Sequence, residues 1–163
     1  MTPVTIRAAT ASDLPVLREI FRRASLSNDC DREALLAHPE ALELSGAAIA
    51  EGRTRVAVGP NDEVVGFITT LAISDTALEI EDLFTEPDWM RRGVARRLVM
   101  ELVSAVEGSG VRRIEVTGNP HASEFYSHMG FIHDHDTQTE FGPAPRLCLT
   151  LDAARLGSRD DAN

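Results

Sequence analysis

The sequence of 163 residues predicts an α+β protein whose sheet is mixed and mostly antiparallel. Three strand-like segments follow one another across residues 54–85 with short turns between them, which is typical of an antiparallel meander. The strand–helix–strand pattern at 77–117 requires a right-handed crossover and therefore one parallel pair of strands. A closing strand is indicated by the alternating leucines Leu147, Leu149 and Leu151.

The first third of the chain is expected to hold one strand and three helices. A strand covers Val4 to Ala8. Ser12-Asp13-Leu14-Pro15 predicts a helix start, because it offers a capping side chain and a proline in the first turn. Apolar residues then recur at helical spacing as far as Ala24. Shorter helices are expected at 31–37, which stops before Pro39, and at 42–50.

Strands and helices alternate over the rest of the chain. The expected strands of the meander are 54–58, 63–73 and 77–85, separated by turn residues. Beyond Pro87 a long helix carries one continuous apolar stripe and stops at Gly108 or Gly110. The remaining elements are a strand over 112–117, a helix from Asn119-Pro120 to about Met129, and strands from Phe131 and over 145–151.

The composition excludes several functions. All 16 basic residues are arginine, against 26 acidic residues, and the net charge is −10. Without lysine, the chain cannot use a lysine Schiff base, a pyridoxal phosphate anchor or the lysine of a phosphate-binding P-loop. An acidic chain is poorly suited to nucleic acid, and no apolar run is long enough to span a membrane. The first residues lack the features of a signal peptide, so we expect a cytoplasmic protein.

The densest basic patch, Arg91-Arg92-Gly93-Val94-Ala95-Arg96-Arg97, lies at the expected start of the long helix. A helix N-terminus carries partial positive charge and unsatisfied N–H groups, so arginines there are unfavourable unless an anion binds. The absence of lysine and of a GxGxxG pattern leaves a diphosphate held by N–H groups and arginine. The alternative is that these arginines pair with Glu86, Asp88 or Glu101.

Two motifs resemble those of the GNAT superfamily of acyl-CoA-dependent N-acetyltransferases. The first runs from Leu78 to Ala95 and is similar to the family's fourth strand and pyrophosphate loop, with pattern [QR]xxGx[GA]. Gly93 and Ala95 match this pattern, whereas its first position is Met90. The second, Asn119 to Phe131, is similar to the family's N…A..FY..xGF helix.

The resemblance implies an α/β/α fold with a six- to seven-stranded sheet flanked by about four to five helices. It implies acetyl-CoA as co-substrate and no metal. Asn119 would hydrogen-bond the pantetheine and Tyr126 would protonate the departing thiolate. The other residues implied in cofactor binding are Leu83, Phe84 and Thr85 beside the pantetheine arm, and Arg91, Arg92, Gly93, Val94, Ala95 and Arg96 around the pyrophosphate.

The chemistry of acyl transfer to an amine is consistent with these roles, because the amine must lose a proton and the CoA thiolate must gain one. Tyr126, the single tyrosine, is the candidate acid; its alternative is a packed amphipathic residue. Glu81 is the candidate base, directly or through water, and shares a strand face with Glu79. A solvated carboxylate is its alternative reading, and Glu79, Asp82 and Glu33 are its rivals.

The expected function is transfer of an acetyl group from acetyl-CoA to a primary amine of a small molecule or protein N-terminus, in a ternary complex. The alternative is a non-catalytic acyl-CoA-binding or sensing module. The family's acceptor pocket corresponds to about residues 26–50 and 135–146, whose acidic side chains favour a cationic amine. A homodimer is compatible with the family.

The remaining expectations concern domain limits and discounted sites. One domain is expected over 1–156, with a polar, frayed tail at 157–163. His133 and His135 lack a third ligand for a metal site, and Cys148 lacks the neighbours of a nucleophile. Cys30 and Cys148 are therefore expected to be structural thiols.

Overall fold

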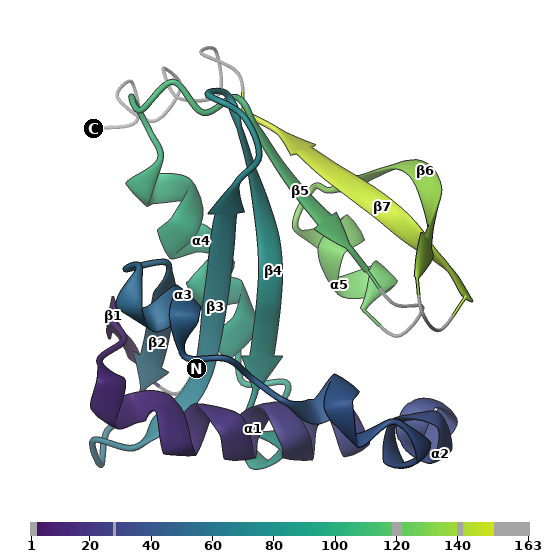
Figure 1. The fold of residues 1–163 in the computed structure, drawn as a ribbon. Helices are drawn as coiled ribbons and strands as arrows, with labels where there is room; N and C mark the ends of the chain where they lie inside the picture. The colour runs from purple at the N-terminus through teal and green to yellow at the C-terminus, as the bar shows by residue number, and fades with distance from the viewer. Residues whose placement is uncertain (1–2, 28, 119–121, 140–141, 152–163) are drawn as a thin grey trace. The chain divides into compact units, whose positions relative to one another are not determined.

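A computed structural model describes residues 3–27, 29–118, 122–139 and 142–151 (Figure 1). The strands are β1 (Thr5–Ala8), β2 (Thr54–Val58), β3 (Val64–Ala72), β4 (Ala77–Thr85), β5 (Arg113–Thr117), β6 (Ile132–Thr139) and β7 (Gly142–Thr150). The helices are α1 (Leu14–Leu26), α2 (Asp29–Ala37), α3 (Ala47–Ala50), α4 (Val94–Ala105) and α5 (Ser123–His128). Within these residues no helix is both long and apolar enough to cross a membrane.

The strands form a mixed sheet of seven, in the order β1-β2-β3-β4-β5-β7-β6. β4 pairs with β5 in parallel, whereas the pairs β1–β2, β2–β3, β5–β7 and β6–β7 are antiparallel. The predicted fold class is therefore confirmed, including the parallel pair that the crossover at 77–117 requires.

Several expected elements have different limits: α2 begins at Asp29 and α4 ends at Ala105, and two further differences have a clear structural reason. The helix predicted over 42–50 is divided into a 3-10 turn at Pro39–Leu42 and α3. The Ser45 hydroxyl accepts the Ala47 N–H at 3.1 Å and so restarts the helix. The last strand begins at Gly142 rather than Pro145. β5 pairs only with residues 146–150, so Pro143 and Pro145 lie where β7 has one partner strand and a missing N–H is tolerated.

The chain divides into two compact units. The first comprises Met1–Thr69 and Asp82–Leu102, and the second comprises Thr70–Glu81 and Val103–Asn163. Strands β3 and β4 contribute residues to both. The predicted tail at 157–163 and the predicted helix start at Asn119-Pro120 lie outside the described residues.

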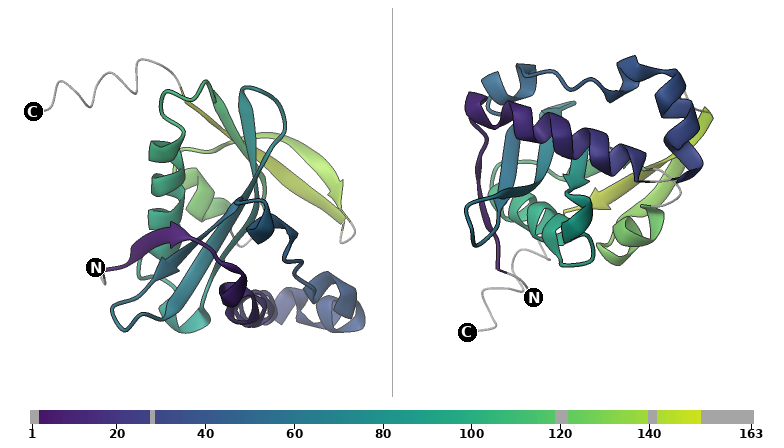
Figure 2. Two further views of the ribbon diagram at one scale, coloured as in Figure 1. Left: turned by 60° about the vertical axis from the view of Figure 1, so that its left-hand side comes forward. Right: turned by 90° about the horizontal axis from the view of Figure 1, so that it is seen from below.

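The core of the first unit lies between α1 and the strands β2 and β3. Its buried side chains are Leu17, Ile20, Val56, Val58 and Phe67. α1 and α4 cover opposite faces of these strands, as the right-hand view of Figure 2 shows. The apolar residues whose spacing predicted α1 and α4 therefore pack these helices against the sheet.

The core of the second unit lies under α5. Residues of three strands that share one face are buried there: Ile80, Ile114, Val116, Leu147 and Leu149. Tyr126 of α5 packs edge-on against Phe131, with ring centroids 5.3 Å apart. The opposite face of these strands carries charged side chains, as β-strand alternation requires.

Asp13 joins the start of α1 to strand β1. Its carboxylate accepts hydrogen bonds from Arg7 Nη1 at 2.8 Å and Nη2 at 3.0 Å, and from the Thr10 N–H at 2.7 Å. The Arg7 guanidinium and the Thr10 N–H together lower the pKa of Asp13 to about 2.

We expect Asp13→Asn to lower the free energy of unfolding at neutral pH by at most about 2 kcal/mol, less if the half-exposed Arg7 is screened by solvent. A lowered carboxyl pKa stabilises the fold above its ordinary value of 3.8, and this stabilisation is lost as pH falls toward about 2. Denaturant unfolding between pH 7 and pH 2 measures it. Parallel pH profiles for wild type and variant would contradict the assignment.

Candidate active site

The turn between β4 and α4 has a backbone conformation suited to an anion. Arg91 has a φ of 64° and Gly93 a φ of 82°, both in the left-handed region. The Gly93 carbonyl accepts the Arg97 N–H at 3.0 Å, so the helical hydrogen bonds of α4 begin at Gly93. In the described part of the chain, none of the N–H groups of residues 91–96 donates a main-chain hydrogen bond. Such a run of open N–H groups at a helix start attracts phosphate.

The arginines of this turn remain available to a ligand. Arg91, Arg92, Arg96 and Arg97 are all exposed. Among the described residues, none of them forms an ion pair with a carboxylate. Two of the carboxylates that could have neutralised them pair elsewhere: Glu86 with Arg23, and Glu101 with Arg55. The alternative that the arginines of the turn pair with Glu86 or Glu101 is therefore wrong.

Two neighbouring contacts hold the turn in place. The Arg92 guanidinium lies over the Trp89 ring, 5.0 Å from its centroid, and Arg97 Nη2 donates to the Val4 carbonyl at 3.3 Å. Trp89 therefore orients an arginine, and Arg97 is turned toward the start of the chain.

Gly66 of β3 lets the start of α4 approach the sheet. A Cβ at this position would lie 2.8 Å from Val94 Cγ1 and 3.0 Å from the Phe84 carbonyl oxygen. Phe84 is itself packed against Phe21 at 4.9 Å and Phe67 at 5.7 Å between ring centroids. The close contact therefore involves both the end of β4 and the first residue of α4.

Gly66→Ala is expected to destabilise the fold by about 1–3 kcal/mol through overpacking and to weaken acetyl-CoA binding by displacing the start of α4. Gly59→Ala is the matched control, because its Cβ would meet only the flexible end of Glu63. Chemical denaturation and calorimetric titration measure the two effects. Equal stability of the two variants would exclude the close approach as a constraint.

Strands β3 and β4 are joined by main-chain hydrogen bonds near both of their ends. The Ile73 N–H donates to the Ala77 carbonyl at one end, and the Glu86 N–H donates to the Val65 carbonyl at the other. The Ser74 N–H also donates to the Ala77 carbonyl, at 3.3 Å, and this pairing has the same register as that of Glu86 with Val65. The stretch Leu83 to Thr85 lies on the Glu86 side, in the first unit.

Tyr126 lies in the second unit, on α5. Its side chain is 6% exposed, and this burial raises the pKa of its phenol to about 12. None of the described residues hydrogen-bonds its hydroxyl. Asn119, the other predicted site residue nearby in sequence, lies outside the described residues.

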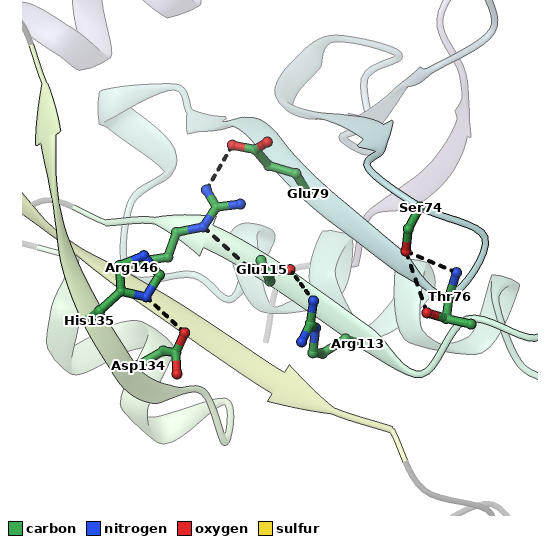
Figure 3. A network of polar contacts seen from close by, with 8 residues as sticks. All are labelled: Ser74, Thr76, Glu79, Arg113, Glu115, Asp134, His135 and Arg146. Carbon is green, nitrogen blue, oxygen red and sulfur yellow. Dashed lines mark hydrogen bonds and ion pairs between the residues drawn. The ribbon is translucent and has the colours of Figure 1, made fainter.

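The predicted base and its rivals have different surroundings. Arg146 Nη1 lies 2.8 Å from Glu79 Oε1, and Arg146 Nε lies 3.5 Å from Glu115 Oε1 (Figure 3). Arg146 Nη1 also lies 2.9 Å from Thr117 Oγ1. Glu79 is thus part of an ion-pair network on the polar face of β4, β5 and β7. Glu81 is exposed at the end of the second unit's part of β4, and Glu33 is exposed on α2.

Arg146 was not predicted from the sequence. It lies 67 residues from Glu79, and the only available signal was an arginine on the polar positions of an alternating strand. Its guanidinium links three strands of the second unit, so it organises the face that carries Glu79 and Glu115.

The two histidines that were discounted as metal ligands each lie beside an aspartate of the same strand. His133 Nε2 lies 2.8 Å from Asp136 Oδ1, and His135 Nδ1 lies 2.8 Å from Asp134 Oδ2. Within the described residues, no group of three or more His, Cys, Asp or Glu side chains is arranged to hold a metal ion. Burial raises the pKa of the Cys148 thiol, which lowers its thiolate fraction.

Comparison with known proteins places this fold and turn in a class of acyl-transferring domains. A family model described as an acetyltransferase (GNAT) domain matches residues 28–143. The chain belongs to this family, which confirms the resemblance carried by residues 78–131. Acetyl-CoA is the acyl donor that GNAT enzymes use.

Individual relatives are distant. An uncharacterized N-acetyltransferase, ycf52, of Gracilaria tenuistipitata var. liui is 29% identical over 75 residues, which are 45% of this chain and 40% of that protein. The chain thus matches about two fifths of the length of this curated relative.

Solved structures show the same fold. The PaiA N-acetyltransferase of Thermoplasma acidophilum, crystallised with coenzyme A, has a TM-score of 0.73 at 16% identity, covering 91% of this chain and 99% of that one. The ribosomal-protein-S18-alanine N-acetyltransferase of Escherichia coli has a TM-score of 0.65 at 21% identity, covering 91% and 93%.

Proposed function

We propose that this protein is an N-acetyltransferase that transfers the acetyl group of acetyl-CoA to a primary amine of a small molecule or a protein N-terminus. The observation that carries the proposal is the turn at Arg91 to Gly93, with its left-handed backbone and the open N–H groups of residues 91–96. The exposed arginines at this helix start suit the pyrophosphate of an acyl-CoA, and the sensing module considered from the sequence would need the same turn, so turnover separates the two functions.

In this proposal the pyrophosphate of acetyl-CoA lies on the N–H groups of the turn, where the helix dipole favours negative charge. Arg91, Arg92 and Arg96 surround it, and guanidinium groups suit phosphate because they donate in pairs. Val94 and Ala95 contribute N–H groups at the first turn of α4.

The pantetheine arm then runs beside Leu83, Phe84 and Thr85, with Asn119 as a hydrogen-bonding partner. A main-chain N–H of this stretch polarises the thioester carbonyl. Such a donor stabilises the oxyanion by several kcal/mol, about 3 in comparable sites.

The reaction is direct attack in a ternary complex. The neutral amine nitrogen forms a bond to the thioester carbonyl carbon, and the C–S bond breaks as the tetrahedral intermediate collapses. Tyr126 donates its phenolic proton to the departing sulfur. The proton lost by the amine passes to Glu81, directly or through water, and the products are an N-acetylamine and CoA.

The phenol of Tyr126 is protonated throughout the neutral range. This would hold at its ordinary pKa of 10.0 as well as at the value of about 12 to which burial raises it, so the donor form is the populated one. Glu79 is a weaker candidate base, because it is committed to the ion pair with Arg146.

The proposal also takes residues 1–156 as one acetyltransferase domain acting in the cytoplasm, alone or as a homodimer. Among the relatives, the Escherichia coli enzyme is described as acting on an alanine of ribosomal protein S18. A protein N-terminus is therefore one acceptor to include beside small amines.

Two measurements test the function. Calorimetry and thermal unfolding with acetyl-CoA should show binding and stabilisation; no stabilisation at saturating ligand would contradict the cofactor site. Release of the CoA thiol is then followed with small amines, amino acids and peptides that carry free N-termini. Binding without release on every acceptor would favour a sensing module.

A further inference from the structure

Trp89, the single tryptophan of the chain, ends a short 3-10 turn that lies between β4 and α4. The Trp89 N–H donates to the Glu86 carbonyl at 2.8 Å, and the Glu86 N–H donates to the Val65 carbonyl at 2.8 Å. The Glu86 carboxylate also accepts a hydrogen bond from Arg23 Nε at 3.1 Å. The main chain that carries the indole is therefore tied to β3 and, through Arg23, to α1.

The indole ring holds the side chain of Arg92. Arg92 Cζ lies over this ring, 5.0 Å from its centroid, a distance at which an indole attracts a guanidinium group. A guanidinium donates hydrogen bonds in its own plane, so contact of its face with a ring leaves the donors available. Among the described residues, none accepts a hydrogen bond from Arg92 and none forms an ion pair with it. The ring therefore restrains this arginine without using its donors.

Two other arginines of the turn lack such a restraint. In the described part of the chain, neither Arg91 nor Arg96 has a side-chain hydrogen bond, an ion pair or an aromatic contact. A long side chain that is free to rotate loses this freedom when it binds a ligand, and the loss weakens affinity. An arginine that is held before binding avoids part of the loss. Of these three side chains, that of Arg92 has this advantage.

We propose that Trp89 is a positioning residue for the acyl donor. Its indole holds Arg92 beside the open N–H groups of the turn, so the pyrophosphate of acetyl-CoA meets a guanidinium that is already in place. The inference rests on the proposed contact between Arg92 and the pyrophosphate. The ring also contributes to donor selectivity, because a thioester with the pantetheine arm but no pyrophosphate gains nothing from it.

Calorimetric titration with acetyl-CoA measures the contribution of the ring. Trp89→Leu is expected to raise the Kd by about 2- to 5-fold, as for the loss of an exposed cation–π contact. Trp89→Phe keeps an aromatic face and should bind within about twofold of the wild type. Wild-type affinity in Trp89→Leu overturns the proposal.

A double-variant cycle shows whether Trp89 acts through Arg92. Arg92→Gln alone is expected to raise the Kd by about tenfold or more, because charge-assisted hydrogen bonds are lost. In this background Trp89→Leu should add less than about twofold, since the guanidinium that the ring holds is gone. Arg22→Gln removes an exposed arginine from α1 and is the matched control, in which Trp89→Leu should keep its full effect. Equal factors in the Arg92→Gln and Arg22→Gln backgrounds assign the loss to packing and overturn the positioning role.

A comparison of CoA with 3′-dephospho-CoA identifies the phosphate concerned. The second ligand keeps the pyrophosphate and lacks the 3′-phosphate, so Trp89→Leu should weaken the binding of both by the same factor. A loss confined to CoA would place Arg92 on the 3′-phosphate and overturn the assignment. In the thiol-release assay, KM for acetyl-CoA should rise while kcat is unchanged, because the contact is the same in the ground state and the transition state.

The fluorescence of Trp89 tests the ring contact without a ligand. Because the chain contains no other tryptophan, its tryptophan emission comes from this ring alone. Arg92→Gln should change the emission intensity, whereas Arg22→Gln should not. Identical emission from Arg92→Gln and the wild type overturns the contact.

Failure of this inference is distinguishable from failure of the proposed function. If the wild type binds acetyl-CoA and Trp89→Leu binds it equally well, the inference alone is overturned and the cofactor site stands. If the wild type shows no binding, the cofactor site is overturned and the role of Trp89 with it. Weaker binding by Trp89→Leu that depends on Arg92 supports both.

Discussion

Gly93→Glu is expected to abolish acetyl-CoA binding, with a loss of at least about 100-fold in affinity if two charge-assisted hydrogen bonds to the pyrophosphate are removed. Gly93 has a φ of 82°, a conformation that costs a non-glycine residue about 1–2 kcal/mol. The new carboxylate would also lie among the N–H groups that the pyrophosphate is proposed to occupy. Calorimetry with acetyl-CoA measures the loss.

Gly52→Glu is the matched control for this variant. Gly52 has a φ of 74°, and nothing lies within 4 Å of a Cβ placed there. It therefore bears the same backbone strain and the same added charge, away from the β4–α4 turn. Wild-type affinity in both variants would refute the anion site, and equal loss in both would show that the effect is general destabilisation.

Tyr126→Phe is expected to lower kcat by about 100-fold or more, the contribution of a well-placed general acid, with little change in the Kd of acetyl-CoA. Removing the hydroxyl leaves the ring contacts with Phe125 and Phe131 in place. Single-turnover kinetics and calorimetry separate the two quantities. Phe125→Leu is the control, because it disturbs the same packing and keeps the phenol.

A second measurement on the same variant is independent of catalysis. Burial raises the pKa of Tyr126 from 10.0 to about 12, so the folded state holds the proton more tightly than the unfolded state. The wild type should lose stability as pH rises from about 10 to about 12, and Tyr126→Phe should lose less. If kcat is unchanged while this alkaline difference is present, Tyr126 is buried but is not the acid.

The sequence was informative where function depends on local spacing. One short segment contains the apolar stripe of α4, Gly93 at the start of this helix, and the arginines around Gly93. Their arrangement therefore follows from helix geometry. The alternation of Leu147 and Leu149 likewise predicted β7. Its start at Gly142 was not predicted, because Pro143 and Pro145 are unusual within a strand.

The sequence was less informative where contacts join distant segments. Nothing in the pattern around Arg23 indicates that it takes Glu86, 63 residues away. The pairing of Thr54 with Thr69 requires the register of two strands, which single residues do not specify. A small cavity lies beside these threonines and is also lined by Ala48 and Ile49 of α3. The residues of α3 were expected to be part of a longer helix.

The arginine side chains at the β4–α4 turn have one further chemical consequence. A thioester acetylates accessible amines, and a lysine held beside the acyl donor would be exposed to that reaction. A guanidinium stays protonated at any physiological pH and is a poor nucleophile. Because the 163 residues contain no lysine, the side chains proposed to bind the donor are inert toward it, and any acetyl-lysine product found in an assay must come from an added acceptor.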